Sequence, residues 1–91
     1  MRKVWKYKIA AHPMTEGKYV TEMPAGAKVL AVAEQRGASF IWAEIDDNAE
    51  IEDRVFFVLG TGHGVPDAAQ HIATWQSMGG VFVWHLYEPM P

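Results

Sequence analysis

The sequence predicts a small, mainly β domain, either an antiparallel sandwich or a partly open barrel of about six or seven short strands. Three observations support this fold class. Short runs rich in Val, Ile, Phe, Tyr and Trp recur along the chain, turn-forming residues separate them at roughly 8–12-residue intervals, and no long stretch has a convincing helical period. With 91 residues, a single domain over residues 1–91 is expected.

The N-terminal third predicts two strands and two turns. Residues 4–10 alternate apolar side chains with Lys6 and Lys8, which is typical of a half-buried edge strand whose lysines discourage aggregation. Residues 11–17 contain Pro and Gly and predict a loop. A short extended segment follows at residues 18–23, and the sequence PAGA at residues 24–27 predicts a turn.

The middle of the chain predicts a hairpin and a further strand. Strands at residues 29–34 and 39–45 flank the sequence QRGA, in which Gly37 supplies the positive φ of a hairpin loop. The acidic run DDNAEIED at residues 46–53 predicts a solvated connection. Calcium binding is the alternative, but the spacing lacks the glycine and the terminal glutamate of an EF-hand. Residues 54–59 (RVFFVL) are a strong strand.

The C-terminal third begins with the glycine-rich stretch GTGHGVPD at residues 60–67. Residues 67–77 fit either a helix or a strand, and a turn followed by a strand from about Gln70 is favoured because of the β-branched and aromatic residues there. A turn at Gly79 and Gly80 precedes the strongest strand, residues 81–88. If the side chains of Phe82 and Trp84 face the core, alternation places those of Val83, His85 and Tyr87 on an outer face too apolar for solvent alone.

Composition excludes several kinds of protein. The chain has no cysteine, which excludes disulfides, thiolate zinc sites and cysteine nucleophiles and favours a reducing compartment. It has no apolar run of the roughly 18 residues that span a bilayer and no signal-peptide pattern. The net charge is −3, without a basic block, so we expect no membrane partner and no duplex nucleic acid partner. A small anionic ligand remains compatible with this charge.

Four segments together resemble a known family. They are EMPAGAKVL at residues 22–30, FIWA at 40–43, GTGH at 60–63 and GGVFVWHLYE at 79–88. In this order they resemble a family of short, functionally uncharacterised proteins encoded by tailed bacteriophages. The resemblance implies a phage origin and expression in the host bacterial cytoplasm, and it implies no activity directly. Other compact phage proteins sequester nucleotide signals of bacterial immune systems, which is an analogy of size and source.

The candidate ligand-binding residues centre on the glycine-rich stretch. GTGH is neither a P-loop nor a dinucleotide turn, but its glycines permit an anion-binding nest or a close approach of ligand to backbone. A plain turn at a strand end is the alternative. A tryptophan can stack a base, and an arginine can bind a phosphate. The predicted ligand-binding residues are Gly60, Thr61, Gly62, His63, Arg54, Trp42, Trp84 and His85.

Catalysis and metal binding have weaker support. His63, His71, His85 and Asp67 lack the HxH or HExxH spacing of a metal site, and Ser39 and Ser77 lack a nucleophile-elbow pattern. We therefore expect no metal, no cofactor and no catalytic residue. A pairing of His63 with Asp67 or Glu88 for phosphodiester cleavage is the remaining enzymatic alternative.

The sequence thus predicts a small binding protein that sequesters a nucleotide-derived immune signal without converting it. A homo-oligomer is expected, because a chain of this size encloses little volume alone. Two alternatives remain open. One is a protein-interaction module that inhibits a host protein or serves as a phage accessory protein, and the other is a phosphodiesterase that degrades cyclic nucleotide signals.

Overall fold

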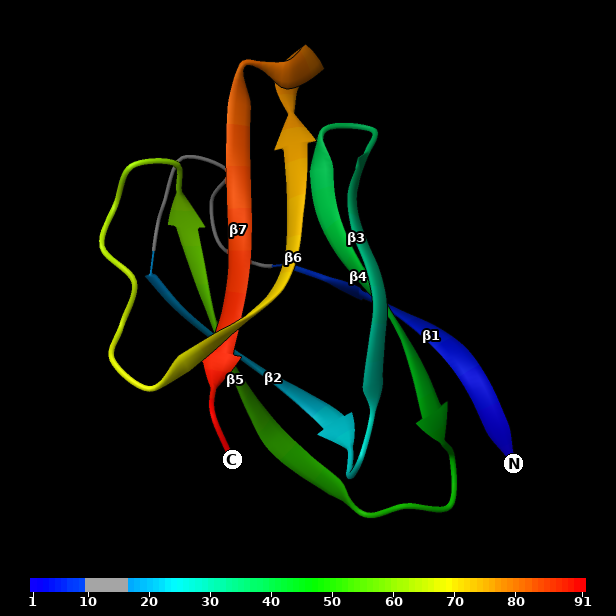
Figure 1. Cartoon of the computed structure of the whole chain (residues 1–91). Helices are drawn as coiled ribbons and strands as arrows, with labels where there is room; N and C mark the ends of the chain where they lie inside the picture. The colour runs from blue at the N-terminus through cyan, green and yellow to red at the C-terminus, as the bar shows by residue number, and fades with distance from the viewer. Residues whose placement is uncertain (10–16) are drawn as a thin grey trace.

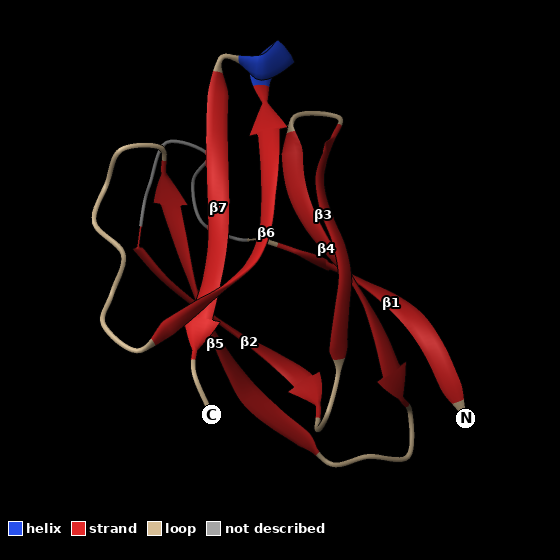
Figure 2. Cartoon of the chain, in the orientation of Figure 1, coloured by secondary structure: helices blue, strands red, loops and turns tan. Residues whose placement is uncertain are grey.

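The computed structural model describes residues 1–9 and 17–91, which form seven strands and one short 3₁₀ turn (Figures 1 and 2). The strands are β1 (Arg2–Lys8), β2 (Gly17–Pro24), β3 (Lys28–Gln35), β4 (Ala38–Asp46), β5 (Ile51–Gly60), β6 (Ala69–Ser77) and β7 (Phe82–Pro89), and the 3₁₀ turn is η1 (Met78–Gly80). The expected loop at residues 11–17 lies outside the described residues except for Gly17.

The strands form two antiparallel sheets that are not closed into a barrel, which confirms the predicted mainly β, antiparallel fold class with six or seven short strands. One sheet has the order β1-β4-β3 and the other the order β2-β5-β7-β6. In the second sheet β7 lies between β5 and β6, so the connection of residues 61–68 must pass β7 to reach the outer strand (Figure 1). This passage places the glycine-rich stretch beside β7.

The core lies between the sheets and follows the predicted alternation. In β4 the side chains of Ile41, Ala43 and Ile45 are at most 1% exposed, whereas those between them face outward. In β7, Trp84 and Leu86 are buried. Burial of this apolar surface is the main stabilising contribution to such a fold. The largest side chains without exposed surface include Phe56, Met23, Ile41, Ile45 and Leu86.

Along one side of the sandwich, β3 of the first sheet lies next to β6 of the second (Figure 1). Two hydrogen bonds join the sheets there. The Trp75 indole N–H donates to Ser39 Oγ at 2.8 Å, and the Met78 amide donates to Glu34 Oε2 at 2.7 Å. The sequence fitted residues 67–77 to either a helix or a strand. In the structure this segment is the edge strand β6 from Ala69 onward, which confirms the favoured strand.

The structure shortens the predicted acidic loop, because β5 begins at Ile51 and only residues 47–50 separate it from β4. Asp46 Oδ1 accepts a hydrogen bond from the Asn48 amide, which lowers the pKa of Asp46. Asp47 pairs with Lys3 and with the N-terminal amine, and these contacts lower the pKa of Asp47. The acidic side chains thus close a turn against β1, and the described residues hold no cluster of three or more metal-ligating side chains.

Two β-bulges shift the register of the sheets. In β3 the pairing with β4 shifts between Val29 and Ala31, and in β6 the pairing with β7 shifts between His71 and Ala73. A bulge inserts one extra residue into a strand, so side chains beyond it change face relative to a regular strand. Both shifts decide which side chains meet on the outer faces described below.

Candidate functional site

The stretch GTGH forms a tight turn at the end of β5. The His63 amide donates to the Gly60 carbonyl at 3.3 Å, and Gly62 has a φ of 91°, a conformation that favours glycine. The turn predicted as the alternative interpretation is therefore present. Because the His63 N–H is bonded within the turn, it is not directed to an anion there.

The turn leaves part of β7 without a neighbouring strand on the β5 side. Pairing of β5 with β7 runs from Phe57–Tyr87 to Gly60–Trp84 and stops there, while β7 continues to Phe82. Beyond this point the Thr61 side chain takes the place of a strand, since Thr61 Oγ1 donates to the Val83 carbonyl at 3.4 Å. Among the described residues, the edge of β7 near Val81 therefore has only side-chain cover.

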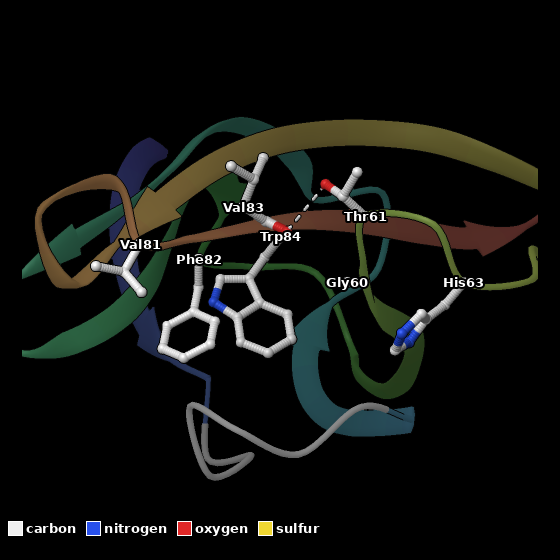
Figure 3. A pocket seen from close by; sticks show the side chains of 7 residues that line it. All are labelled: Gly60, Thr61, His63, Val81, Phe82, Val83 and Trp84. Atoms are coloured by element: carbon white, nitrogen blue, oxygen red, sulfur yellow. Dashed lines mark hydrogen bonds between the residues drawn. The ribbon is translucent and has the colours of Figure 1, made fainter.

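A hollow of about 460 Å³ lies at this edge. Figure 3 shows the side chains of Phe82 and Trp84 projecting from one side of β7 and that of Val83 from the other, with Thr61 beside Val83 and His63 farther along the loop that follows β5. The hollow thus follows the edge of the strand where β5 leaves it. Its lining residues are Gly60, Thr61, His63, Val81, Phe82, Val83 and Trp84.

An aromatic pair forms one wall of this hollow. The rings of Phe82 and Trp84 are stacked, with centroids 5.9 Å apart and an interplanar angle of 27°. The Trp84 indole N–H donates to Ser77 Oγ at 2.9 Å, which fixes the orientation of the indole. Trp84 is only 6% exposed, so it offers an edge rather than a full face. The half-buried Phe82 is the more accessible ring.

A second hollow, of about 190 Å³, lies on the other side of the turn. Thr61 and His63 line both hollows, so the GTGH turn is the wall between them. The second hollow adds His85 and Tyr87 from the outer face of β7. Its lining residues are Leu59, Gly60, Thr61, Gly62, His63, Val65, His85 and Tyr87.

A chain of hydrogen bonds leads from Thr61 across the outer face of the four-stranded sheet. His85 Nε2 lies 2.8 Å from Thr61 Oγ1, and His85 Nδ1 lies 2.9 Å from Thr74 Oγ1. Thr74 Oγ1 lies 2.8 Å from His71 Nε2. Because Thr61 donates to a carbonyl, it accepts from the His85 Nε2–H. In a neutral imidazole, His85 Nδ1 then accepts from the Thr74 hydroxyl. The Thr61 hydroxyl therefore directs its proton to the Val83 carbonyl and one lone pair to His85, and its second lone pair is the one that a ligand could use.

The bulge in β6 makes this chain possible. His71 and Thr74 are three residues apart and would lie on opposite faces of a regular strand. The extra residue between His71 and Ala73 brings both to the outer face, opposite Tyr87 and His85 of β7. The His71 ring also meets the Tyr87 ring edge-on at 5.3 Å between centroids. Sequence reasoning missed His71 and Thr74 as site residues because no local signal reveals the bulge.

The structure brings together six of the eight predicted ligand-binding residues. Those lining the larger hollow are Gly60, Thr61, His63 and Trp84, and those lining the smaller one include Gly62 and His85. Sequence reasoning did not assign Phe82, which forms the accessible ring. Base stacking was assigned to the neighbouring Trp84, because a tryptophan was expected to provide the aromatic face.

Arg54 and Trp42 line neither hollow. Arg54 Nε donates to Glu88 Oε2 at 2.9 Å, and Arg54 Nη1 donates to the Ala27 carbonyl at 2.8 Å. This partly buried pair links β5 to the other end of β7 and also occupies Glu88, the proposed acid–base partner of His63. Trp42 lies in the three-stranded sheet on its outer face. No lysine or arginine is among the described residues that line either hollow.

The two hollows together present polar groups beside aromatic rings. They combine the hydroxyls of Thr61 and Tyr87, the imidazoles of His63 and His85, backbone groups and an aromatic wall at the edge of a strand. The part of the chain that the structure describes also contains no helix with the length and apolar character that crossing a membrane requires.

A family model described as "Domain of unknown function (DUF7352)" matches residues 1–91. No curated protein and no solved structure matches the chain. The match confirms the expected relationship to an uncharacterised family, and the phage origin stays a prediction.

Proposed function

Since the chain belongs to the DUF7352 family of domains of unknown function along its whole length, we propose from the geometry that it is a binding protein without catalytic activity. The larger hollow takes a small, nucleotide-derived signalling molecule and holds it without conversion. The phage origin, action in the host bacterial cytoplasm and a homo-oligomeric state belong to this proposal as predictions.

One observation carries the proposal. Two segments far apart in the sequence, the GTGH turn and the start of β7, meet at one hollow of about 460 Å³. Sites for small molecules typically measure about 300–1,000 Å³ and combine an apolar lining with a few polar groups. Here Phe82 and Trp84 supply the apolar wall, and Thr61 and His63 supply the polar groups.

The lining also limits how a nucleotide would lie. Its planar base fits against the accessible ring of Phe82, because base–aromatic stacking gains roughly 1–3 kcal/mol per base. Ribose hydroxyls or phosphate oxygens would meet Thr61 and His63. Because lysine and arginine are missing from the described lining, the phosphates of such a ligand are expected at the mouth of the hollow rather than inside it.

Incubation with cyclic dinucleotides, cyclic trinucleotides and ADP-ribose derivatives tests the proposal. A bound ligand raises Tm by mass action, and release of the unchanged compound after denaturation shows sequestration. Recovery of a hydrolysed product would instead establish a phosphodiesterase. Analytical ultracentrifugation with and without ligand tests the predicted homo-oligomer.

The substitution His63→Ala provides a sharper prediction. We expect it to weaken ligand binding at least tenfold, because it removes an imidazole from both hollows (about 1.4 kcal/mol). His63 is exposed, so Tm should change by no more than about 4 °C. Isothermal titration and thermal unfolding measure the two effects, with Asn48→Ala on the 47–50 turn as the control. A large fall in the Tm of His63→Ala would show that His63 stabilises the fold, and it would contradict the prediction.

A protein-interaction module is the second candidate, and the open edge of β7 favours it. Val81 is 71% exposed and Met78 is 58% exposed beside the unpaired part of this strand. A strand edge with free backbone groups can accept an extended peptide. For this candidate, no compound of the panel would shift Tm, and Val81→Asp would impair binding to a defined partner while leaving the fold intact.

A further inference from the structure

The outer face of the three-stranded sheet carries two neighbouring aromatic rings among basic side chains. We propose that this face, defined by Arg2, Lys6, Lys8, Lys28, Phe40 and Trp42, is a binding site for single-stranded nucleic acid. It belongs to the other sheet from the hollows and is independent of the function proposed above.

The two rings form a half-buried platform on the outer face of the sheet. Phe40 and Trp42 alternate with the buried residues of β4 and therefore share the outer face. Their centroids are 6.1 Å apart at an interplanar angle of 55°. Their partners across the pair in β3 are Ala33 and Ala31, both exposed. Because alanine side chains are short, they leave the rings accessible from that side, so that bases can stack on them.

The bulge in β3 contributes to this platform. Leu30 is the extra residue at the register shift, and it is 47% exposed. Beyond it Ala31 lies opposite Trp42, while Val32 turns to the core at 8% exposed. If the pairing of Lys28 and Val29 continued without the bulge, the larger Leu30 would lie opposite Trp42 and Val32 opposite Phe40. The bulge therefore places the smallest side chains beside the rings.

Basic side chains border the rings on the opposite side. Lys6 pairs with Trp42 and Lys8 with Phe40 in the register of β1 with β4, so all four share one face. Lys6 Nζ lies over both rings, 4.2 Å from the Phe40 centroid and 5.8 Å from the Trp42 centroid, so a stacking base would displace this side chain toward the phosphates. Its hydrogen-bond partner is the neutral Gln35 side chain at 2.7 Å. A phosphate that approached the rings would therefore meet a cation already held there.

The charge of this face is opposite to that of the whole chain. Arg2 is paired with Glu44 at 2.8 Å, but Lys6, Lys8 and Lys28 form no ion pair with a described residue. The net charge of the chain is −3, so unpaired cations on one face are a local feature. A polyanion is attracted to such a face, whereas a second copy of it would be repelled.

The combination of rings and cations favours a single strand over a duplex. In a duplex the bases are stacked on one another, and their faces cannot reach Phe40 or Trp42. A single strand can place its bases on aromatic side chains and its phosphates on neighbouring cations, with little dependence on sequence. Stacking of bases on Phe40 and Trp42 is therefore available to a single strand, whereas a duplex could bind this face only through its phosphates.

Fluorescence anisotropy with labelled oligothymidylate and oligouridylate of about 15 nucleotides tests this proposal, and the two oligonucleotides separate DNA from RNA. We expect binding to either or both at low salt, with quenching of tryptophan emission. Trp42→Ala should weaken binding at least fivefold, as expected for a lost stacking contact of about 1 kcal/mol or more. Circular dichroism establishes that this variant is folded.

The double substitution Lys6→Gln with Lys8→Gln provides a second test on exposed residues. It should weaken binding and reduce the slope of log K against log salt by about 1.4, since each phosphate contact on a single strand contributes about 0.7. Lys18→Gln, an exposed cation of β2 in the other sheet, is the matched control and should alter the slope little.

Three results would overturn the proposal. They are no binding at about 50 mM salt, unchanged affinity in both the Trp42 and the lysine variants, or duplex competing as well as single strand. Thr61→Val should leave oligonucleotide binding intact while impairing the small ligand of the hollow. Failure of one site is thereby distinguished from failure of the other.

Discussion

The hydroxyl group of Tyr7 is buried and has no hydrogen-bond partner in the described structure. A buried hydroxyl that loses its contact with water costs about 1–3 kcal/mol when nothing replaces that contact. We therefore expect Tyr7→Phe to raise the unfolding free energy by about 1 kcal/mol in urea denaturation. Tyr19→Phe is the matched control, because Tyr19 donates to the Lys8 carbonyl at 2.7 Å. Tyr19→Phe should lower the unfolding free energy by about 0.5–1.5 kcal/mol. A change of the same sign in both variants would contradict this explanation.

Burial also raises the pKa of Tyr7 above its usual value. Below the pKa of an unfolded tyrosine, near pH 10, both states are protonated and the shift has no effect on stability. Above that pH the unfolded chain releases the proton first, which stabilises the unfolded state and lowers the unfolding free energy. Urea denaturation at about pH 8 and pH 11 should show a larger alkaline loss for the wild type than for Tyr7→Phe. Equal losses would assign the alkaline sensitivity to other groups.

At the scale of elements, the Arg54–Glu88 pair ties three segments together. Arg54 in β5 binds Glu88 in β7 and the carbonyl of Ala27, which follows the turn after β2. The side chains are 22% and 14% exposed, so water screens the pair only partly. We expect Glu88→Gln to lower the unfolding free energy by roughly 1–3 kcal/mol, as for hydrogen bonds to charged groups.

The exposed pair between Arg2 and Glu44 is the comparison for this prediction. Its side chains are 81% and 32% exposed, and exposed pairs contribute about 0–1 kcal/mol. Glu44→Gln should therefore change the unfolding free energy less than Glu88→Gln in the same denaturation experiment. The reverse order would show that the partly buried pair is not a structural link.

Hairpin and bulge elements differed in how well they could be predicted. The sequence QRGA predicted a tight hairpin with positive φ at Gly37, and the structure gives Gly37 a φ of 83°. Arg36 also has a positive φ, 53°, which two-residue hairpin loops of this type require. The bulges have no such signal, because no residue type around Ile72 or Leu30 demands them. The faces on which His71 and Ala31 lie could therefore be learned only from the structure.

For the whole molecule, alternation of side chains sufficed to predict an antiparallel β fold and the inner face of β4, but it left a sandwich and a partly open barrel as alternatives. It could not predict the order of the strands, because pairing across the sheets depends on contacts distant in sequence. The insertion of β7 between β5 and β6 is such a contact. It explains why Trp84 and the GTGH turn meet.

The same limitation explains where the predicted site was too broad. Arg54 lies six residues before Gly60 on the same strand, but β5 spans residues 51–60, which sets the two at different ends of the sheet. Trp42 belongs to the other sheet altogether. Residue type indicated what each side chain could bind, and only the topology decided which of them could bind together.

Strand β1 has one neighbour, β4, and six of its seven residues are exposed. Release of β1 would require separation of this pair and loss of the Tyr19–Lys8 hydrogen bond, while the strand pairs of the other sheet stayed intact. Local openings of this kind need less free energy than global unfolding. In deuterated water, the amides of β1 should therefore exchange well before those of β5 and β7, and an oligonucleotide lying across Lys6 and Lys8 would slow that exchange.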